Sequence, residues 1–110
     1  SESVVSEEEG DNLSKLIDED NIEDVKAKYL EFKNRYSKNI VELAKYLDLD
    51  DLEKLIVEIK QFEKENDFYI LESYITKLYN SYQSFDIEQV QKLLAEYAKI
   101  IETINIKLSL

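Results

Sequence analysis

The sequence predicts an all-α fold, an antiparallel up-down-up-down four-helix bundle with an acidic N-terminal extension. Apolar residues recur at spacings of three and four over most of the chain, which is the period of one helix face. Proline is absent and glycine occurs once in 110 residues, so the chain lacks the turn residues that a sheet needs. We therefore expect helices joined by short polar corners, an arrangement that favours antiparallel neighbours.

The acidic extension precedes the bundle. Residues 1–24 hold ten acids and one lysine, which gives −9 of the formal net charge of −11. We expect residues 1–20 to be an acidic linker. A short helix at residues 12–19 is an alternative, and it would place Leu13, Leu16 and Ile17 on the bundle. Residues 21–110 form the predicted bundle.

The first helix is expected at residues 22–47. Asn21 is a good N-cap, and Glu23 and Asp24 suit the positive end of the helix dipole. The apolar face of this helix contains Val25, Tyr29, Phe32, Tyr36, Ile40, Leu43 and Leu47. The corner DLDD at residues 48–51 ends this helix and caps the next one.

Three further apolar stripes predict the other helices. The second stripe contains Leu52, Leu55, Ile56, Ile59 and Phe62, and it ends in the polar run EKEND. The third contains Phe68, Leu71, Ile75, Leu78 and Tyr82. The fourth contains Ile87, Val90, Leu94, Tyr97, Ile101, Ile104 and Leu108. Asp86 opens the fourth helix, with Gln89 three residues later in a capping-box arrangement.

The eight tyrosines fall into two groups. Those on the stripes should be core residues whose hydroxyls reach the rim of the bundle: Tyr29, Tyr36, Tyr82 and Tyr97. The others lie off or beside the stripes: Tyr46, Tyr69, Tyr74 and Tyr79. Tyr69 and Ile70 give the third helix apolar groups on more than one face. This predicts either that the third helix is the innermost one or that its extra apolar groups form an exposed partner surface.

The composition excludes several chemistries. The chain has no histidine and no cysteine, which removes the common zinc, haem and copper ligands and the bases or nucleophiles of serine and cysteine hydrolases. The acids Asp48, Asp50 and Asp51 lack the glycine and the glutamate that a calcium loop needs further on. We expect no metal, no cofactor and no enzyme activity. A small hydrolase that uses paired carboxylates is the least favoured alternative.

Charge also limits the partners. Residues 25–110 hold fifteen acids and thirteen bases, so the predicted bundle is nearly neutral. Phosphate contacts need clustered Lys and Arg, and anionic membrane surfaces attract the same clusters. A bilayer span needs about 18 or more consecutive apolar residues, and the chain has no such run. We expect a protein partner, no nucleic-acid binding and no membrane insertion.

Two stretches carry a family resemblance: YLEFKNRYSKNIVELAKYLDLDDLEKLIVEIKQF at residues 29–62 and ILESYITKLYNSYQSFDIEQVQKLLAEY at residues 70–97. Their order of features resembles the histidine phosphotransfer family, whose four-helix bundles pass a phosphoryl group between receiver domains. That family has a Phe-bearing first helix, an acidic corner and a second helix with His-x-Leu-Lys-Gly. A Leu-rich third helix and an Asp-led fourth helix follow. The resemblance covers roughly residues 22–107.

The resemblance places Val57 where the family has its phosphorylated histidine. Ile59 matches the leucine, Lys60 matches the lysine, and Gln61 replaces the glycine. Asp48 precedes Val57 by the nine residues that the family's corner acid shows. Valine has no nucleophile, and Gln61 adds bulk where the glycine lets a receiver approach. The resemblance therefore implies a pseudo-phosphotransfer module that binds a receiver or a kinase without transferring phosphate.

We expect the binding face on the exposed sides of the second and third helices. Its candidate residues are Lys54, Val57, Glu58, Lys60, Gln61 and Glu65. The alternative is a helical module of an exported or surface protein that binds a host or cell-wall partner. The first hypothesis implies a cytoplasmic location, and the second implies an extracellular location or the cell surface.

Overall fold

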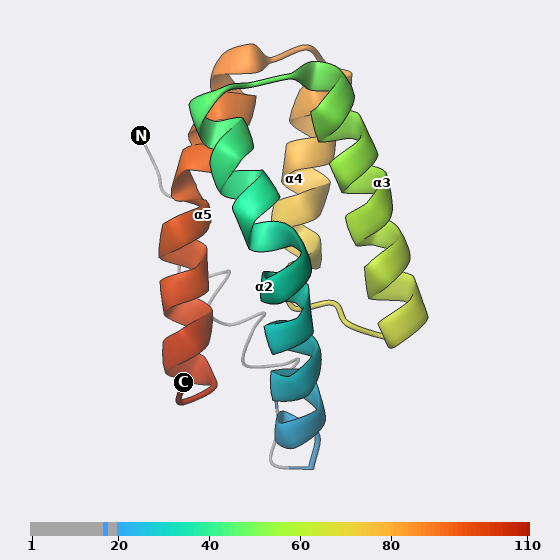
Figure 1. Cartoon of the computed structure of the whole chain (residues 1–110), viewed down its shortest axis with the longest axis vertical. Coiled ribbons are helices and arrows are strands. Elements are labelled where there is room, and N and C mark those ends of the chain that lie inside the picture. Colours follow the sequence, from blue (N-terminus) through green and yellow to red (C-terminus); the bar gives the residue numbers. More distant parts are fainter. Residues whose placement is uncertain (1–16, 18–19) are drawn as a thin grey trace.

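The computed structural model describes Ile17 and residues 20–110, and within this part of the chain it contains four α-helices and no strand. The helices are α2 (Ile22–Lys45), α3 (Leu49–Asn66), α4 (Glu72–Gln83) and α5 (Ile87–Lys107). The α2–α3 and α4–α5 corners lie at one end of the molecule, and the α3–α4 connection lies at the other (Figure 1). Both α2 and α4 pack against α3 and α5, so the four helices surround one core. The prediction of an all-helical, four-helix fold is confirmed.

Two predicted caps form at the starts of α3 and α5. The side chain of Asp48 accepts a hydrogen bond from the N–H of Asp51 at 3.0 Å, and that of Asp86 accepts one from the N–H of Gln89 at 3.2 Å. Each bond satisfies an N–H that the first turn of a helix leaves without a partner. Asn21 takes the N-cap position of α2, but its side chain makes no capping hydrogen bond. The acidic corner therefore acts as the sequence predicts.

The connection between α3 and α4 is longer than the third apolar stripe predicts. Helix α4 begins at Glu72, so Phe68 lies in the connection, yet its side chain is buried. Asp67 ends α3 in the left-handed conformation with φ 51°, a conformation that short polar residues tolerate. The ring of Phe68 then packs 5.8 Å from that of Phe32 and 5.7 Å from that of Phe62. The stripe identified a buried residue correctly, but this residue is not helical.

An aromatic cluster fills the core beside the α3–α4 connection. It joins the rings of Phe32, Tyr36, Phe62 and Phe68, whose contacting centroids lie 5.3–5.9 Å apart in tilted or edge-on pairs. Such pairs contribute about 0.5–1.5 kcal/mol each beyond the burial of their area. Because the four rings come from α2, α3 and the connection, they fix these three segments together.

Tyrosine hydroxyls tie the helices to one another. The Tyr29 hydroxyl donates to Oδ1 of Asn105 at 2.6 Å, which joins α2 to α5. Tyr74, expected beside a stripe, is buried, and its hydroxyl donates to the carbonyl of Leu93 at 2.7 Å. Helix α4 exposes Thr76 and Lys77 to solvent. The prediction that this helix is the innermost one is therefore wrong. Tyr69 and Ile70 precede α4, and Ile70 is buried whereas Tyr69 is exposed.

The predicted linker at residues 1–20 and the short helix at residues 12–19 lie outside the described residues, apart from Ile17 and Asp20. Ile17 is partly buried and packs against the hydrophobic core. In the part of the chain that the structure describes, no helix combines the length and the apolar character needed to cross a membrane.

Candidate partner-binding site

Five of the six predicted partner-binding residues share one face of α3: Lys54, Val57, Glu58, Gln61 and Glu65. Their spacings of three and four residues place them on one side of the helix. All five side chains are exposed to solvent. Val57 is 60% exposed although its side chain is apolar. The structure therefore brings these five residues together on an accessible surface.

Lys60, the sixth predicted residue, is also exposed and lies at the edge of this face that borders α4. Its Nζ lies 3.9 Å from the ring centroid of Tyr79 in α4, which is a cation–π contact. This contact places Lys60 at the seam between α3 and α4, at the edge of the face that carries Val57. The resemblance assigns Lys60 to the lysine of the family pattern, and in the structure its side chain contacts the neighbouring helix α4.

The face that carries Val57 borders a groove between α2 and α3. One hollow of about 460 Å³ is lined from α2 by Arg35 and Tyr36, and from α3 by Val57, Glu58, Gln61, Phe62 and Glu65. A second hollow of about 540 Å³ lies nearer the α2–α3 corner. Glu58 lines both hollows, so they adjoin along the two helices. The sequence reasoning expected α3 and α4 to form the site, whereas the groove lies between α2 and α3.

Polar contacts hold side chains in the first hollow. The amide Nε2 of Gln61 donates to Oε1 of Glu65 at 2.6 Å, along the surface of α3. Across the groove, the guanidinium of Arg35 lies 5.5 Å from the ring centroid of Phe62 and 3.4 Å from a carboxylate oxygen of Glu31. The side chain of Val57 has only apolar atoms, so it can offer a partner nothing but apolar contact.

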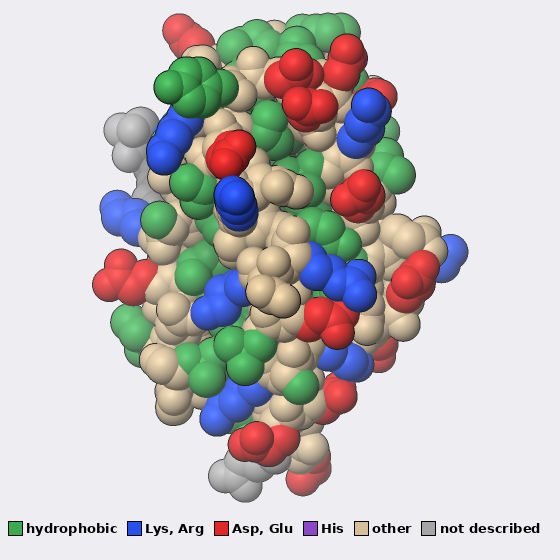
Figure 2. Space-filling view, viewed as in Figure 1, with side chains coloured by type: hydrophobic (Ala, Val, Ile, Leu, Met, Phe, Trp, Pro, Cys, Tyr) green, Lys and Arg blue, Asp and Glu red, His purple; other side chains and the backbone are tan. Residues whose placement is uncertain are grey.

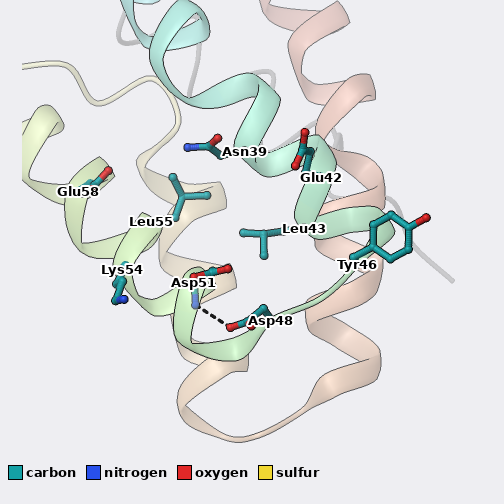
Figure 3. Close-up of a pocket in the computed structure, with 9 residues that line it drawn as sticks. All are labelled: Asn39, Glu42, Leu43, Tyr46, Asp48, Asp51, Lys54, Leu55 and Glu58. Atoms are coloured by element: carbon teal, nitrogen blue, oxygen red, sulfur yellow. Dashed lines mark hydrogen bonds between the residues drawn. The ribbon is translucent and has the colours of Figure 1, made fainter.

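The second hollow, which we call the acidic hollow, is shown in Figure 3. Helix α2 and its C-cap contribute Asn39, Glu42, Leu43 and Tyr46. The corner and α3 contribute Asp48, Asp51, Lys54, Leu55 and Glu58. The two leucines are buried and lie at the middle of the hollow, and the charged side chains surround them. Figure 2 shows acidic side chains gathered over this end of α2 and α3.

The sequence reasoning missed the α2 side of this groove. Asn39, Glu42 and Tyr46 are spaced three and four residues apart, so they share one side of α2. Tyr46 is 82% exposed, and its position off the apolar stripe was the available signal. The sequence does not show which side of α2 faces α3, so it could not assign these residues to the site.

The most perturbed carboxyl group lies outside the groove. Glu63 is only 4% exposed, and among the described residues its Oε2 has no hydrogen-bond partner. Burial, and then the nearby charge of Glu72, raise the pKa of Glu63 from its ordinary 4.5 to about 7, and Lys60 opposes this rise. Among the described residues, no group of three or more His, Cys, Asp or Glu side chains could hold a metal ion.

No protein-family model, curated protein or solved structure matches this chain. No relative therefore supplies a function for the groove. The exposure, the shape and the charge of the residues that line the groove are the features that bear on its function.

Proposed function

We propose that this chain is a non-catalytic protein-interaction domain, a pseudo-phosphotransfer module that binds a receiver or kinase domain in two-component signalling. Its framework would be an antiparallel up-down-up-down bundle with an acidic N-terminal extension. The observation that supports this function best is the exposure of Val57, which is 60% accessible on the outer face of α3. The family resemblance assigns this position to a side chain that a receiver must reach.

The neighbours of Val57 suit binding without chemistry. The chain contains no histidine, and the isopropyl group of Val57 has no lone pair with which to attack a phosphoryl group. The hydrogen bond from Gln61 to Glu65 holds the Gln61 amide along the helix, so it leaves more room over Val57 than a projecting side chain would. A partner could therefore approach this face closely, although Gln61 replaces the small glycine of the family pattern.

The residues around Val57 support the proposal that this face binds a protein. An exposed apolar centre is bordered by the polar and charged side chains of Glu58, Gln61 and Glu65 on α3 and Arg35 on α2. Apolar centres contribute affinity, and charged rims set the association rate and the choice of partner. The two hollows extend this surface along both helices.

A nuclear magnetic resonance titration tests the proposal. The isotope-labelled domain is titrated with receiver and kinase domains encoded in the same genome, and the perturbed backbone amides are mapped. We expect perturbations at the α3 residues that line the groove and at Arg35, Asn39 and Tyr46 of α2. Perturbations confined to the outer surface of α5, or no perturbation by any receiver or kinase domain, would contradict the proposed function.

A further inference from the structure

The acidic hollow has an apolar floor. Leu43 of α2 and Leu55 of α3 are both buried, and their side chains lie at the middle of the hollow in Figure 3. With a volume of about 540 Å³, the hollow has room for a long side chain and for part of the segment that carries it. The aliphatic stems of lysine and arginine bury themselves along such surfaces while their charged ends remain near water.

The rim of the hollow carries an excess of negative charge. Four carboxylates line it, those of Glu42, Asp48, Asp51 and Glu58, against the single cation of Lys54. Among the described residues, the ion pairs join Lys26 to Glu23, Lys28 to Asp24 and Arg35 to Glu31, and none of them includes one of these four acids. In Figure 3 the side chain of Lys54 points away from the leucine floor. The rim is therefore complementary to a cation.

An exposed aromatic ring lies at the edge of the hollow, and in Figure 3 it points outward from the two leucines. Tyr46, the C-cap of α2, is 82% exposed and lines the hollow beside Glu42. Its ring face can attract a lysine ammonium or an arginine guanidinium. The chain already makes such contacts elsewhere, between Lys60 and Tyr79 and between Lys33 and Tyr29. An aliphatic floor, a carboxylate rim and an exposed ring together match the three parts of a long basic side chain.

We propose that the acidic hollow receives an arginine or lysine side chain from a basic segment of the protein partner. This inference rests on the proposed function and names the chemistry of the surface that docks. The basic side chain lies over Leu43 and Leu55, its charged end is shared by Glu42 and Glu58, and Tyr46 stacks against it. The partner's apolar residues then reach Val57, which lies one helical turn beyond Lys54 along α3.

The probe is a short helical peptide that carries two arginines on one face, compared with the same peptide in which glutamine replaces both. Binding to the full chain is measured by calorimetry and by amide chemical shifts at low and at physiological salt. We expect the arginine peptide to perturb Glu42, Tyr46 and Glu58, and to bind less tightly as salt screens the charges. The glutamine peptide should bind at least tenfold more weakly. Absent or equal binding by the two peptides would overturn the inference.

A matched pair of double variants separates the hollow from general attraction between opposite charges. Glu42→Gln with Glu58→Gln should weaken binding of the arginine peptide at least tenfold. Glu88→Gln with Glu102→Gln removes the same charge from exposed positions on α5 and should change the affinity less than twofold. Equal losses in both double variants would show non-specific attraction and overturn the inference.

The outcomes also separate this inference from the proposed function. If receiver or kinase domains perturb the face that carries Val57 while the arginine peptide does not bind, the basic-segment inference fails and the proposed function stands. If the arginine peptide binds in the hollow while no receiver or kinase domain binds, the basic-segment inference stands. The proposal that the partner is a receiver or kinase domain is then wrong.

Discussion

Replacing Glu63 by glutamine should remove a loss in the free energy of unfolding that occurs as the pH rises. Glu63 is buried at the seam between α3 and α4, and its raised pKa of about 7 means that the folded chain holds a proton that the unfolded chain releases near 4.5. Below pH 4.5 both states are protonated, and the stability is complete. Between pH 4.5 and 7 only the unfolded state ionises, so the free energy of unfolding falls as the pH rises. Above pH 7 the loss is complete.

The size of this loss follows from the two pKa values. The interval from 4.5 to about 7 corresponds to roughly 3 kcal/mol if solvent does not relax around the ionised carboxylate. Water that reaches the ionised group would reduce the loss to about 2 kcal/mol. Glu63→Gln keeps the shape of the side chain without its charge, so the variant should be more stable than the parent by ~2 kcal/mol at pH 8 and nearly equal to it at pH 4.

The assay is urea denaturation followed by circular dichroism between pH 4 and pH 8. The difference between Glu63→Gln and the parent is the quantity of interest, because other carboxyl groups contribute equally to both proteins. Glu58→Gln, an exposed position on the same helix, is the control and should stay within about 0.5 kcal/mol of the parent. Parallel pH profiles for Glu63→Gln and the parent would refute the reasoning.

Three further predictions concern the core, a cap and the candidate site. Phe68→Ala removes one ring from the aromatic cluster and leaves a cavity, so it should lower the free energy of unfolding in urea by about 3–5 kcal/mol. Phe85 is exposed, and Phe85→Ala should lower it by about 0.5 kcal/mol or less. Equal losses in the two variants would contradict this packing. Asp86→Ala should lower the free energy of unfolding by about 1 kcal/mol in thermal denaturation, and Asp86→Ser should lower it much less, because serine can still accept the hydrogen bond from the N–H of Gln89. Equal stability of Asp86→Ala and the parent would show that this cap contributes nothing. Val57→His should accept labelled phosphate from a phosphorylated receiver that binds the domain, whereas Val41→His on α2 should not. Labelling of both variants, or of neither, would contradict the assignment of Val57 to the histidine position.

The sequence predicts the helices because their signals are local. The three-four spacing of apolar residues identifies the buried face of each helix, and the acids Asp48 and Asp86 mark the starts of α3 and α5 through bonds to N–H groups three residues away. The start of α4 was placed too early because Phe68 continues the apolar spacing through the connection. Asp67 adopts the left-handed conformation and ends α3 there. An aspartate followed by an aromatic residue is not a sequence signal that predicts this conformation.

The candidate site was predicted only in part because it depends on how two helices pack. One face of α3 follows from helix geometry, so the sequence alone places Val57 and its neighbours on the same side of the helix. The contribution of Tyr46 from α2 depends on the rotation of α2 about its axis, which tertiary contacts set. The cation–π contact of Lys60 with Tyr79 likewise depends on how α3 and α4 pack together. Burial of Glu63 was not expected either, because this residue begins the polar run EKEND.

The most direct test of the central claim is the affinity of a receiver or kinase domain for two matched variants of this domain. Val57→Glu places a charge at the centre of the proposed interface, and Val41→Glu places the same charge at an exposed valine of α2 outside the groove, 42% accessible in the structure. We predict that Val57→Glu raises the Kd at least tenfold, or ~1.4 kcal/mol, and that Val41→Glu changes it less than twofold. Equal effects of the two substitutions, or a loss only with Val41→Glu, would contradict the account.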